Sequence, residues 1–170
     1  GNREFFTNRL DALLLTEHEN QEEIRGAVIL IQCNEGELME SLYGHKTLLT
    51  LILSFIETIK VRLASCNYYF IARRAEYELA LLLPGFYVKE TEKLADRLLK
   101  NLQLQTLPIG INQDEFIHMG ITCFNHKHKP YQVMAEADMA LRSAQLQGPS
   151  QWFMYDRGEV LKESAKGSLQ

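Results

Sequence analysis

The sequence lacks long apolar runs, an excess of basic residues and an even number of cysteines. No apolar run approaches the roughly 20 residues that a helix needs to cross a bilayer, and no signal peptide is recognised. Lysine and arginine number 18 against 22 acidic residues, so the net charge of −4 gives no electrostatic case for nucleic acid. Cys33, Cys66 and Cys123 cannot all pair, and we expect buried, reduced thiols.

What remains is the composition of an ordinary globular domain. With 170 residues, of which 46% are hydrophobic and 24% charged, the chain can form one domain with a sizeable core. Because it opens at Gly1 rather than at a methionine, and already in a helical pattern, we expect a domain of a longer protein. The parent protein could then carry membrane segments that this chain lacks.

Apolar periodicity predicts strands interleaved with helices. Helical spacing predicts helices at residues 3–16, 45–64, 88–104 and 131–147. Short apolar or alternating runs predict strands at residues 26–32, 116–124 and 152–155. The polar, acidic residues 33–41 are assigned no element. This order predicts an α/β (α+β) domain in which helices pack on a mixed sheet.

Residues 67–85 predict a β-hairpin with an unusual turn. An aromatic and β-branched run, residues 67–73, is followed by an apolar run that ends at Pro84-Gly85. Tight hairpin turns usually contain glycine or asparagine, because positive φ is needed there. The turn region here, residues 74–77, contains neither.

This hairpin resembles the signature of GGDEF domains, the diguanylate cyclase fold. The family pattern is an arginine, one variable residue, Gly-Gly-Asp/Glu-Glu-Phe, an alanine, and an apolar run ending in proline. Arg73, Ala80 and Pro84 match the flanks. The signature itself reads Ala75, Glu76, Tyr77, Glu78 and Leu79, so it keeps only Glu78.

Further landmarks resemble the family in the same order along nearly all of the chain. They are Asn2-Arg3, Tyr43-Gly44-His45, Gly120, and Ala137-Asp138 with the later Gly148. The resemblance implies a palm-like, ferredoxin-related GGDEF fold over residues 1–156, with a central mixed sheet, the signature hairpin and helices packed on it.

The resemblance also implies where the chemistry would lie. Diguanylate cyclases condense two GTP molecules into cyclic di-GMP, which requires carboxylates for Mg²⁺, cations for phosphates and backbone open to the triphosphate. The family's metal ligands correspond to Gln32 and Tyr77, and neither is a good Mg²⁺ ligand. Its two signature glycines correspond to Ala75 and Glu76, whose side chains take up room, and Glu76 adds an anion.

The remaining family positions have changed as well. By the resemblance, the phosphate-binding cations correspond to Glu37, Gln145 and Pro149, the guanine-reading residues to Glu40 and Leu49, and the Arg-x-x-Asp product-inhibition site to Cys66 and Tyr69. Leu49 is expected on the buried face of its helix. We therefore expect no cyclase activity, no metal or other cofactor, and no binding of cyclic di-GMP through that motif. Glu78 is expected to be a hairpin surface or salt-bridge residue.

Two basic clusters have alternative interpretations. His126-Lys127-His128 has the residue types of a metal pair but lacks further ligands, and we expect a solvated loop. Arg73-Arg74 could bind an anion or an acidic partner surface, and the simpler expectation is an ion pair at the end of a strand.

The resemblance implies a degenerate GGDEF domain that regulates. Residues 157–170 resemble the linker helix that leads to an EAL domain, and the whole pattern is similar to LapD-type receptors. The implied partners are the EAL domain and the signalling helix of the same parent, with a homodimer possible. The implied place is the cytoplasmic part of an inner-membrane receptor, without direct membrane contact by this domain. The alternatives are a degenerate domain that binds GTP and controls an adjacent EAL phosphodiesterase, a working cyclase, and a structural module unrelated to cyclic di-GMP.

Overall fold

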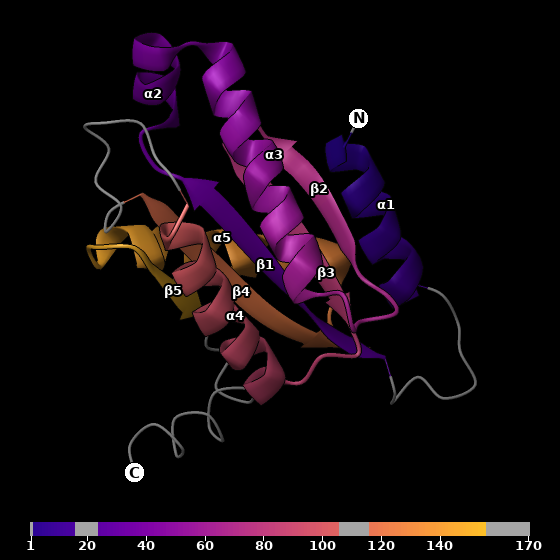
Figure 1. Ribbon diagram of the computed structural model, residues 1–170. Helices are drawn as coiled ribbons and strands as arrows, with labels where there is room; N and C mark the ends of the chain where they lie inside the picture. Colours follow the sequence, from indigo (N-terminus) through magenta and orange to yellow (C-terminus); the bar gives the residue numbers. More distant parts are fainter. Residues whose placement is uncertain (1, 16–23, 106–115, 156–170) are drawn as a thin grey trace.

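The computed structural model describes residues 2–15, 24–105 and 116–155 (Figure 1). Its elements are α1 (Asn2–Leu15), β1 (Arg25–Cys33), α2 (Gly36–Tyr43), α3 (His45–Arg62), β2 (Phe70–Ala75), β3 (Glu78–Pro84), α4 (Val88–Gln103), β4 (Ile117–Asn125), α5 (Pro130–Leu146) and β5 (Gln151–Met154). The predicted linker at residues 157–170, and residue 156 at the predicted domain boundary, lie outside the described residues. None of the described helices is both long and apolar enough to cross a bilayer.

The five strands form one mixed sheet in the order β2-β3-β1-β4-β5. β1 is antiparallel to both β3 and β4, β2 is antiparallel to β3, and β4 is parallel to β5. The mixed sheet predicted from the sequence is therefore confirmed. Its central strand β1 is a continuous apolar run because both faces of the sheet are covered.

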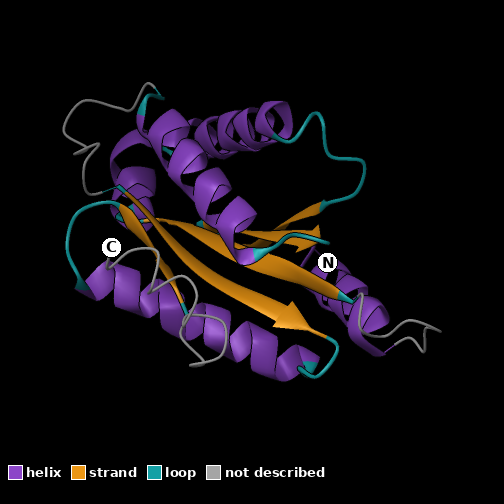
Figure 2. Ribbon diagram, turned by 90° about the horizontal axis from the view of Figure 1, so that it is seen from below, coloured by secondary structure: helices purple, strands orange, loops and turns teal. Residues whose placement is uncertain are grey.

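Helices cover the two faces of the sheet (Figure 2). One core lies under α3 and α4, where Phe55 and Leu98 belong to the same cluster as Ile29 of β1. The other core lies under α1 and α5, where Leu10 and Leu141 belong to the same cluster as Leu30. Neighbouring residues of β1 thus feed opposite cores, as the alternation of side chains in a strand requires.

Two details of the predicted elements were wrong. The polar segment after β1 contains a helix, α2, whose Met39 is fully buried. It was missed because an eight-residue helix with one buried apolar side chain gives little periodic signal. Leu49, expected on the buried face of α3, is only half-buried, whereas Leu51 is buried. The buried stripe of α3 therefore runs along Leu51 and Phe55, and Leu49 lies at its margin.

The hairpin turns without glycine because one strand carries an extra residue. Arg73 pairs with Leu79 and Ala75 pairs with Glu78, so Arg74 is bulged out of the β2–β3 register. Glu76 and Tyr77 form the turn, and neither has a positive φ. A bulge changes the local twist of a ribbon. It allows this turn to close with negative φ at both residues.

Candidate functional site

Several residues that the resemblance assigns to the family's catalytic positions lie where β1, the hairpin turn and α2 come together. Gln32, near the end of β1, pairs with Glu78 on β3 and with His118 on β4. The backbone N–H of Cys33 donates to the carbonyl of Tyr77 at 2.9 Å, which ties the turn to the end of β1. The segments that carry these positions therefore meet in the structure, and their side chains decide what the site can do.

Tyr77 closes the space between the hairpin and α2. A Cβ atom at Gly36, the first residue of α2, would lie 2.4 Å from Cγ of the Tyr77 ring, so the ring rests directly on bare backbone. The Tyr77 hydroxyl donates a hydrogen bond of 2.7 Å to Oε2 of Glu40. The other carboxylate oxygen of Glu40 lies 3.3 Å from Nδ1 of His45. Tyr77, at the position expected for a metal ligand, is therefore hydrogen-bonded to Glu40, at the position expected to read guanine.

The Tyr77–Glu40 bond changes the acidity of both groups. The hydrogen bond from Tyr77, followed by the contact with His45, lowers the pKa of Glu40. The same bond raises the pKa of Tyr77 well above its ordinary value. At neutral pH the site therefore contains an ionised carboxylate and a protonated phenol.

Gln32 is held by another changed position. Its Oε1 accepts a hydrogen bond from Nε2 of Gln145 on α5. By the resemblance, Gln145 is assigned to one of the family's phosphate-binding cations, and Gln32 to one of its metal ligands. Two neutral amide side chains thus form a hydrogen bond with each other at positions where an active family member would have a carboxylate and a cation.

Glu78, the kept residue of the signature, forms an ion pair inside the domain. Arg74 Nη1 lies 2.6 Å from Oε2 of Glu78 and 2.8 Å from Oδ1 of Asp138 on α5. The salt-bridge expectation for Glu78 is confirmed. The expectation of a surface position is wrong, because Glu78 is only 6% exposed. Burial disfavours the charge of Arg74, but its hydrogen bonds to Asp138 and Glu78 outweigh that effect and raise its pKa.

Arg73 is also engaged: its Nη2 donates to the backbone carbonyl of Glu76 at 2.8 Å. The strand-end ion pair expected of Arg73-Arg74 is therefore made by Arg74, with Arg73 binding the turn.

The other predicted positions lie around the site or away from it. Glu37, Ala75, Glu76 and Pro149 are exposed. Cys66 and Tyr69 are half-buried against the core under α3 and α4. They precede β2, at the opposite end of that strand from the turn, so the structure does not bring them to the other positions. Their assignment to an absent inhibition site stays a prediction.

A buried histidine completes the polar cluster and was missed from the sequence. His118 is 2% exposed, and its Nε2 lies 2.7 Å from the carbonyl oxygen of Gly148. A carbonyl only accepts, so Nε2 carries the proton and Nδ1 accepts from Nδ2 of Asn34 at 2.6 Å. In the sequence His118 is one polar residue inside an alternating strand, and only its register opposite Gln32 reveals its place.

No group of three or more histidine, cysteine or acidic side chains that could hold a metal ion occurs within the described part of the chain. His126 and His128 lie in the loop between β4 and α5, as expected, but the expectation that they are solvated is wrong, because both are half-buried. Nδ1 of His128 accepts from the backbone N–H of Asn125 at 2.9 Å, whereas Nδ1 of His126 is buried and has no hydrogen-bond partner among the described residues. The three cysteines are free thiols, as predicted. Cys33 and Cys123 are buried and Cys66 is half-buried.

Solved structures with the same fold are diguanylate cyclase domains and their relatives. The active GGEEF domain of a diguanylate cyclase from Vibrio cholerae aligns with a TM-score of 0.78 and 16% identity, covering 92% of this chain and 97% of that one. The GGDEF domain of DgcB from Caulobacter crescentus, solved in complex with c-di-GMP, aligns with a TM-score of 0.74 and 17% identity, covering 90% of each chain. The predicted GGDEF fold is thereby confirmed.

Sequence comparison gives the same family. RNase E specificity factor CsrD of Escherichia coli is 30% identical over 174 residues, which covers all of this chain and 26% of CsrD. The chain therefore spans about a quarter of the length of that relative. The profile of the family described as "Diguanylate cyclase, GGDEF domain" matches residues 1–151. The chain belongs to the diguanylate cyclase GGDEF domain family.

Proposed function

We propose that this GGDEF domain is a degenerate, catalytically silent member of its family. It would act as a regulatory, protein-interacting module in cyclic di-GMP signalling. The observation that carries the proposal is the position of Tyr77, whose ring lies on Gly36 and whose hydroxyl is bonded to Glu40. This contact fills the space between the hairpin and α2 with the protein's own side chains.

The metal-binding positions support this proposal. Mg²⁺ binds through hard oxygen ligands, mostly carboxylates. The phenol of Tyr77 keeps its proton at neutral pH because its pKa is raised by the bond to Glu40. The amide oxygen of Gln32 is neutral and already accepts from Gln145. Neither residue offers the negative charge that would hold a metal ion against a triphosphate.

The charges around the site also oppose nucleotide binding. Glu40, with its lowered pKa, is an anion at neutral pH, and Glu37 and Glu76 add exposed carboxylates. The nearby arginines already bind groups of the protein. Arg74 forms ion pairs with Glu78 and Asp138, and Arg73 donates a hydrogen bond to the backbone of the turn. A polyphosphate would therefore meet carboxylates where an active cyclase presents cations.

The CsrD relation supports a regulatory role. That protein is named a specificity factor, and its identity of 30% extends over this whole chain. We propose that this domain is part of a longer parent protein and lies in the cytoplasm. We further propose that it docks on a neighbouring EAL domain or signalling helix, as in LapD-type receptors.

The name of CsrD favours a second candidate, in which the parent contributes to the specificity of RNase E. The test is the affinity of immobilised RNase E for the 170-residue chain. Binding by this chain, but not by a control domain whose surface residues have been scrambled, would favour this candidate. No binding would count against a direct role of this domain.

The primary test is calorimetric titration of the chain with GTP, with and without Mg²⁺, and then with cyclic di-GMP. No heat of binding is expected in any of the three. Heat with GTP would overturn the filled-site argument and favour the alternative, a GTP-binding domain that controls an adjacent EAL phosphodiesterase. Binding of cyclic di-GMP would require a site other than the family motif.

A matched variant tests the cause of the expected silence. Gln32→Asp combined with Tyr77→Asp restores two carboxylates and removes the ring from Gly36. We expect this variant to bind Mg²⁺ more tightly than the unchanged chain in the same calorimetric experiment. Equal affinity in both proteins would mean that the two positions do not limit metal binding.

A further inference from the structure

Helix α5 carries an exposed apolar stripe that the packing of the domain itself does not use. Tyr131, Met139 and Leu146 are 74%, 51% and 80% exposed. Ala135 and Arg142, which are also exposed, lie between them. The five positions follow one another at intervals of four, four, three and four residues, so they form one face of the helix. At 1.5 Å per residue, this stripe is about 22 Å long.

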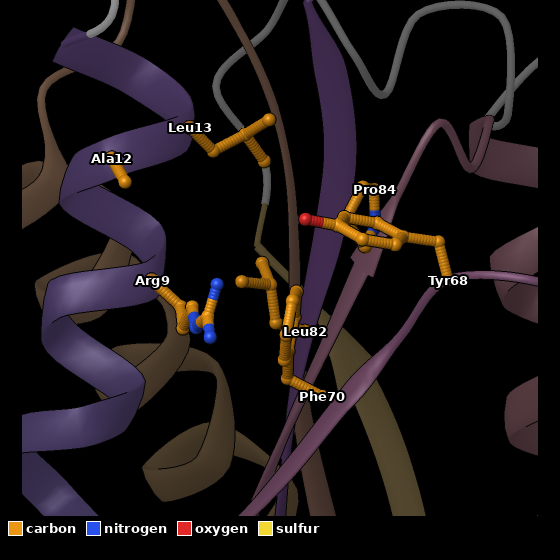
Figure 3. A pocket seen from close by; sticks show the side chains of 7 residues that line it. All are labelled: Arg9, Ala12, Leu13, Tyr68, Phe70, Leu82 and Pro84. Carbon is orange, nitrogen blue, oxygen red and sulfur yellow. The ribbon is translucent and has the colours of Figure 1, made fainter.

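The stripe lies on the side of α5 that faces away from the sheet. The other side of the helix buries Val133, Ala137 and Leu141 in the core that it shares with α1. α5 lies behind the sheet in Figure 1, on the face opposite to α3 and α4. A hollow between α1 and the β2–β3 ribbon is separate, because no residue of α5 lines it (Figure 3). The stripe is therefore a ridge, which another helix can pack against and a small molecule cannot enter.

The stripe is complementary to itself when two copies of α5 run in opposite directions. Tyr131 is eight residues before Met139, and Leu146 is seven residues after it. With a twofold axis next to Met139, Tyr131 of each copy lies opposite Leu146 of the other. The short side chain of Ala135 then lies opposite the long side chain of Arg142. One antiparallel register thus covers all the apolar side chains of the stripe in both copies.

The charged residues of α5 favour this antiparallel direction. In this register, Arg142 of one copy lies within one helical turn of Asp138 of the other. Asp138 binds Arg74 of its own domain, but its side chain is 47% exposed and its oxygens can accept further hydrogen bonds. In a parallel pair, Arg142 would face Arg142 and Asp138 would face Asp138, and like charges repel. The helix dipoles also favour opposite directions.

We propose that α5 is a dimerisation surface whose occupant is α5 of a second copy of this chain, packed antiparallel about a twofold axis. A single pair of helices offers less than the roughly 800 Å² per partner of a standard stable interface, so we expect a dissociation constant on the order of 100 μM. This affinity is sufficient where a longer parent already holds two copies together, because tethering gives effective concentrations on the order of millimolar.

This inference goes beyond the proposed function, which concerns a partner within the same parent. The nucleotide titration tests Gln32, Tyr77 and Glu40, none of which lies on α5. Failure of either experiment therefore leaves the other interpretable.

The test is sedimentation equilibrium of the 170-residue chain from about 10 μM to about 1 mM, a range that brackets the expected dissociation constant. The weight-average mass should rise from 19.6 kDa toward twice that value across the range. A mass that stays at 19.6 kDa at the highest concentration would overturn the proposal.

Met139→Glu tests the centre of the interface. It places two carboxylates next to the twofold axis, each close to Asp138 of the other copy, and should leave a folded monomer at all of these concentrations. Leu53→Glu is the matched control, because Leu53 lies on α3 and is 52% exposed, against 51% for Met139. The control adds the same charge on the other face of the sheet and should dimerise like the unchanged chain. Dimerisation of folded Met139→Glu, or its loss in Leu53→Glu, would contradict the inference.

Two changes at Ala135 test the direction of pairing. Ala135→Glu places a carboxylate opposite Arg142 twice in the dimer and should tighten dimerisation about fourfold, whereas Ala135→Lys should weaken it by about the same factor. In a parallel pair, both changes would set like charges opposite each other, and both would weaken the dimer. Equal effects of the two changes would therefore rule out the proposed arrangement.

Discussion

The hydroxyl of Tyr77 donates a 2.7 Å hydrogen bond to Glu40, and this contact joins the hairpin turn to helix α2. Tyr77 and Glu40 are 37 residues apart in the chain. In the family resemblance they correspond to a metal ligand and a base-reading residue. Here they bond to each other, so the contact that closes the site also sets the protonation of both groups.

The first prediction concerns the pKa of Glu40. Tyr77→Phe removes the largest cause of its lowered value, so the pKa of Glu40 should rise toward its ordinary range. A ¹³C-detected NMR titration of the Glu40 carboxyl measures this directly. Tyr87→Phe, in which the altered ring lies over Arg25, is the control and should leave the pKa of Glu40 unchanged.

The same bond gives the domain an acid-dependent stability. Because the folded pKa of Glu40 is lowered, its contribution is present above the unfolded pKa of about 4.3 and is lost as pH falls below that value. Urea unfolding at pH 6 and pH 3.5 should show a larger loss of stability in the unchanged chain than in Tyr77→Phe. An equal loss in both would mean that Glu40 is not stabilised by Tyr77.

The second prediction concerns packing at Gly36. A Cβ atom there would lie between 2.4 and 2.9 Å from three atoms of the Tyr77 ring. Gly36→Ala should therefore lower the melting temperature, because the ring must move and weaken its bond to Glu40. In a Tyr77→Ala background the same change should be tolerated or stabilising, since alanine favours a helix over glycine. Melting curves of the four proteins form a double-mutant cycle. Additive effects would disprove the contact.

The third prediction concerns the buried ion pair of the hairpin. The side chains of Arg74 and Glu78 are 13% and 7% exposed, so Arg74→Met leaves a buried carboxylate without its partner. Breaking such a pair from one side costs about 3 kcal/mol of unfolding free energy. Asp138→Asn, at a position that is 47% exposed, should cost less than about 1 kcal/mol. Denaturant unfolding of both variants makes the comparison, and similar losses would argue against the pair as the main stabilising contact.

Strong local patterns in the sequence predicted most of the fold. The continuous apolar run of β1 and the spaced apolar residues of α3 identify their elements because burial acts on each residue separately. The order of elements was then enough for the mixed sheet. Helix α2 was not predicted because its only large buried side chain is Met39, and a single buried position defines no helical period.

The contacts of the site could be predicted only in part. The sequence alone predicts poor metal ligands at Gln32 and Tyr77, the positions that the resemblance assigns to metal binding. Their new partners are not, because Gln32 and Gln145 are 113 residues apart and meet only when α5 packs on the sheet. Gly36 carried a usable signal, since glycine permits close approach of another group, but the sequence does not say that the approaching group is Tyr77.

The last prediction concerns Cys33, whose thiol is buried at the end of β1. Burial raises its pKa to about 12, whereas an unfolded cysteine titrates near 8.5. The stability that this thiol contributes is therefore complete below about pH 8.5 and is lost as pH rises toward the folded pKa, by about 1.4 kcal/mol per pH unit once the unfolded thiol is ionised. Urea unfolding at pH 8 and pH 9.5 should show a smaller alkaline loss in Cys33→Ala than in the unchanged chain. Cys66→Ala, at a half-buried position, serves as the control.

Iodoacetamide at pH 8 gives an independent measure, because native Cys33 should remain unmodified and should react once the chain is unfolded. Rapid labelling of native Cys33 would show that the end of β1 opens to solvent, and would remove the basis for the expected alkaline loss.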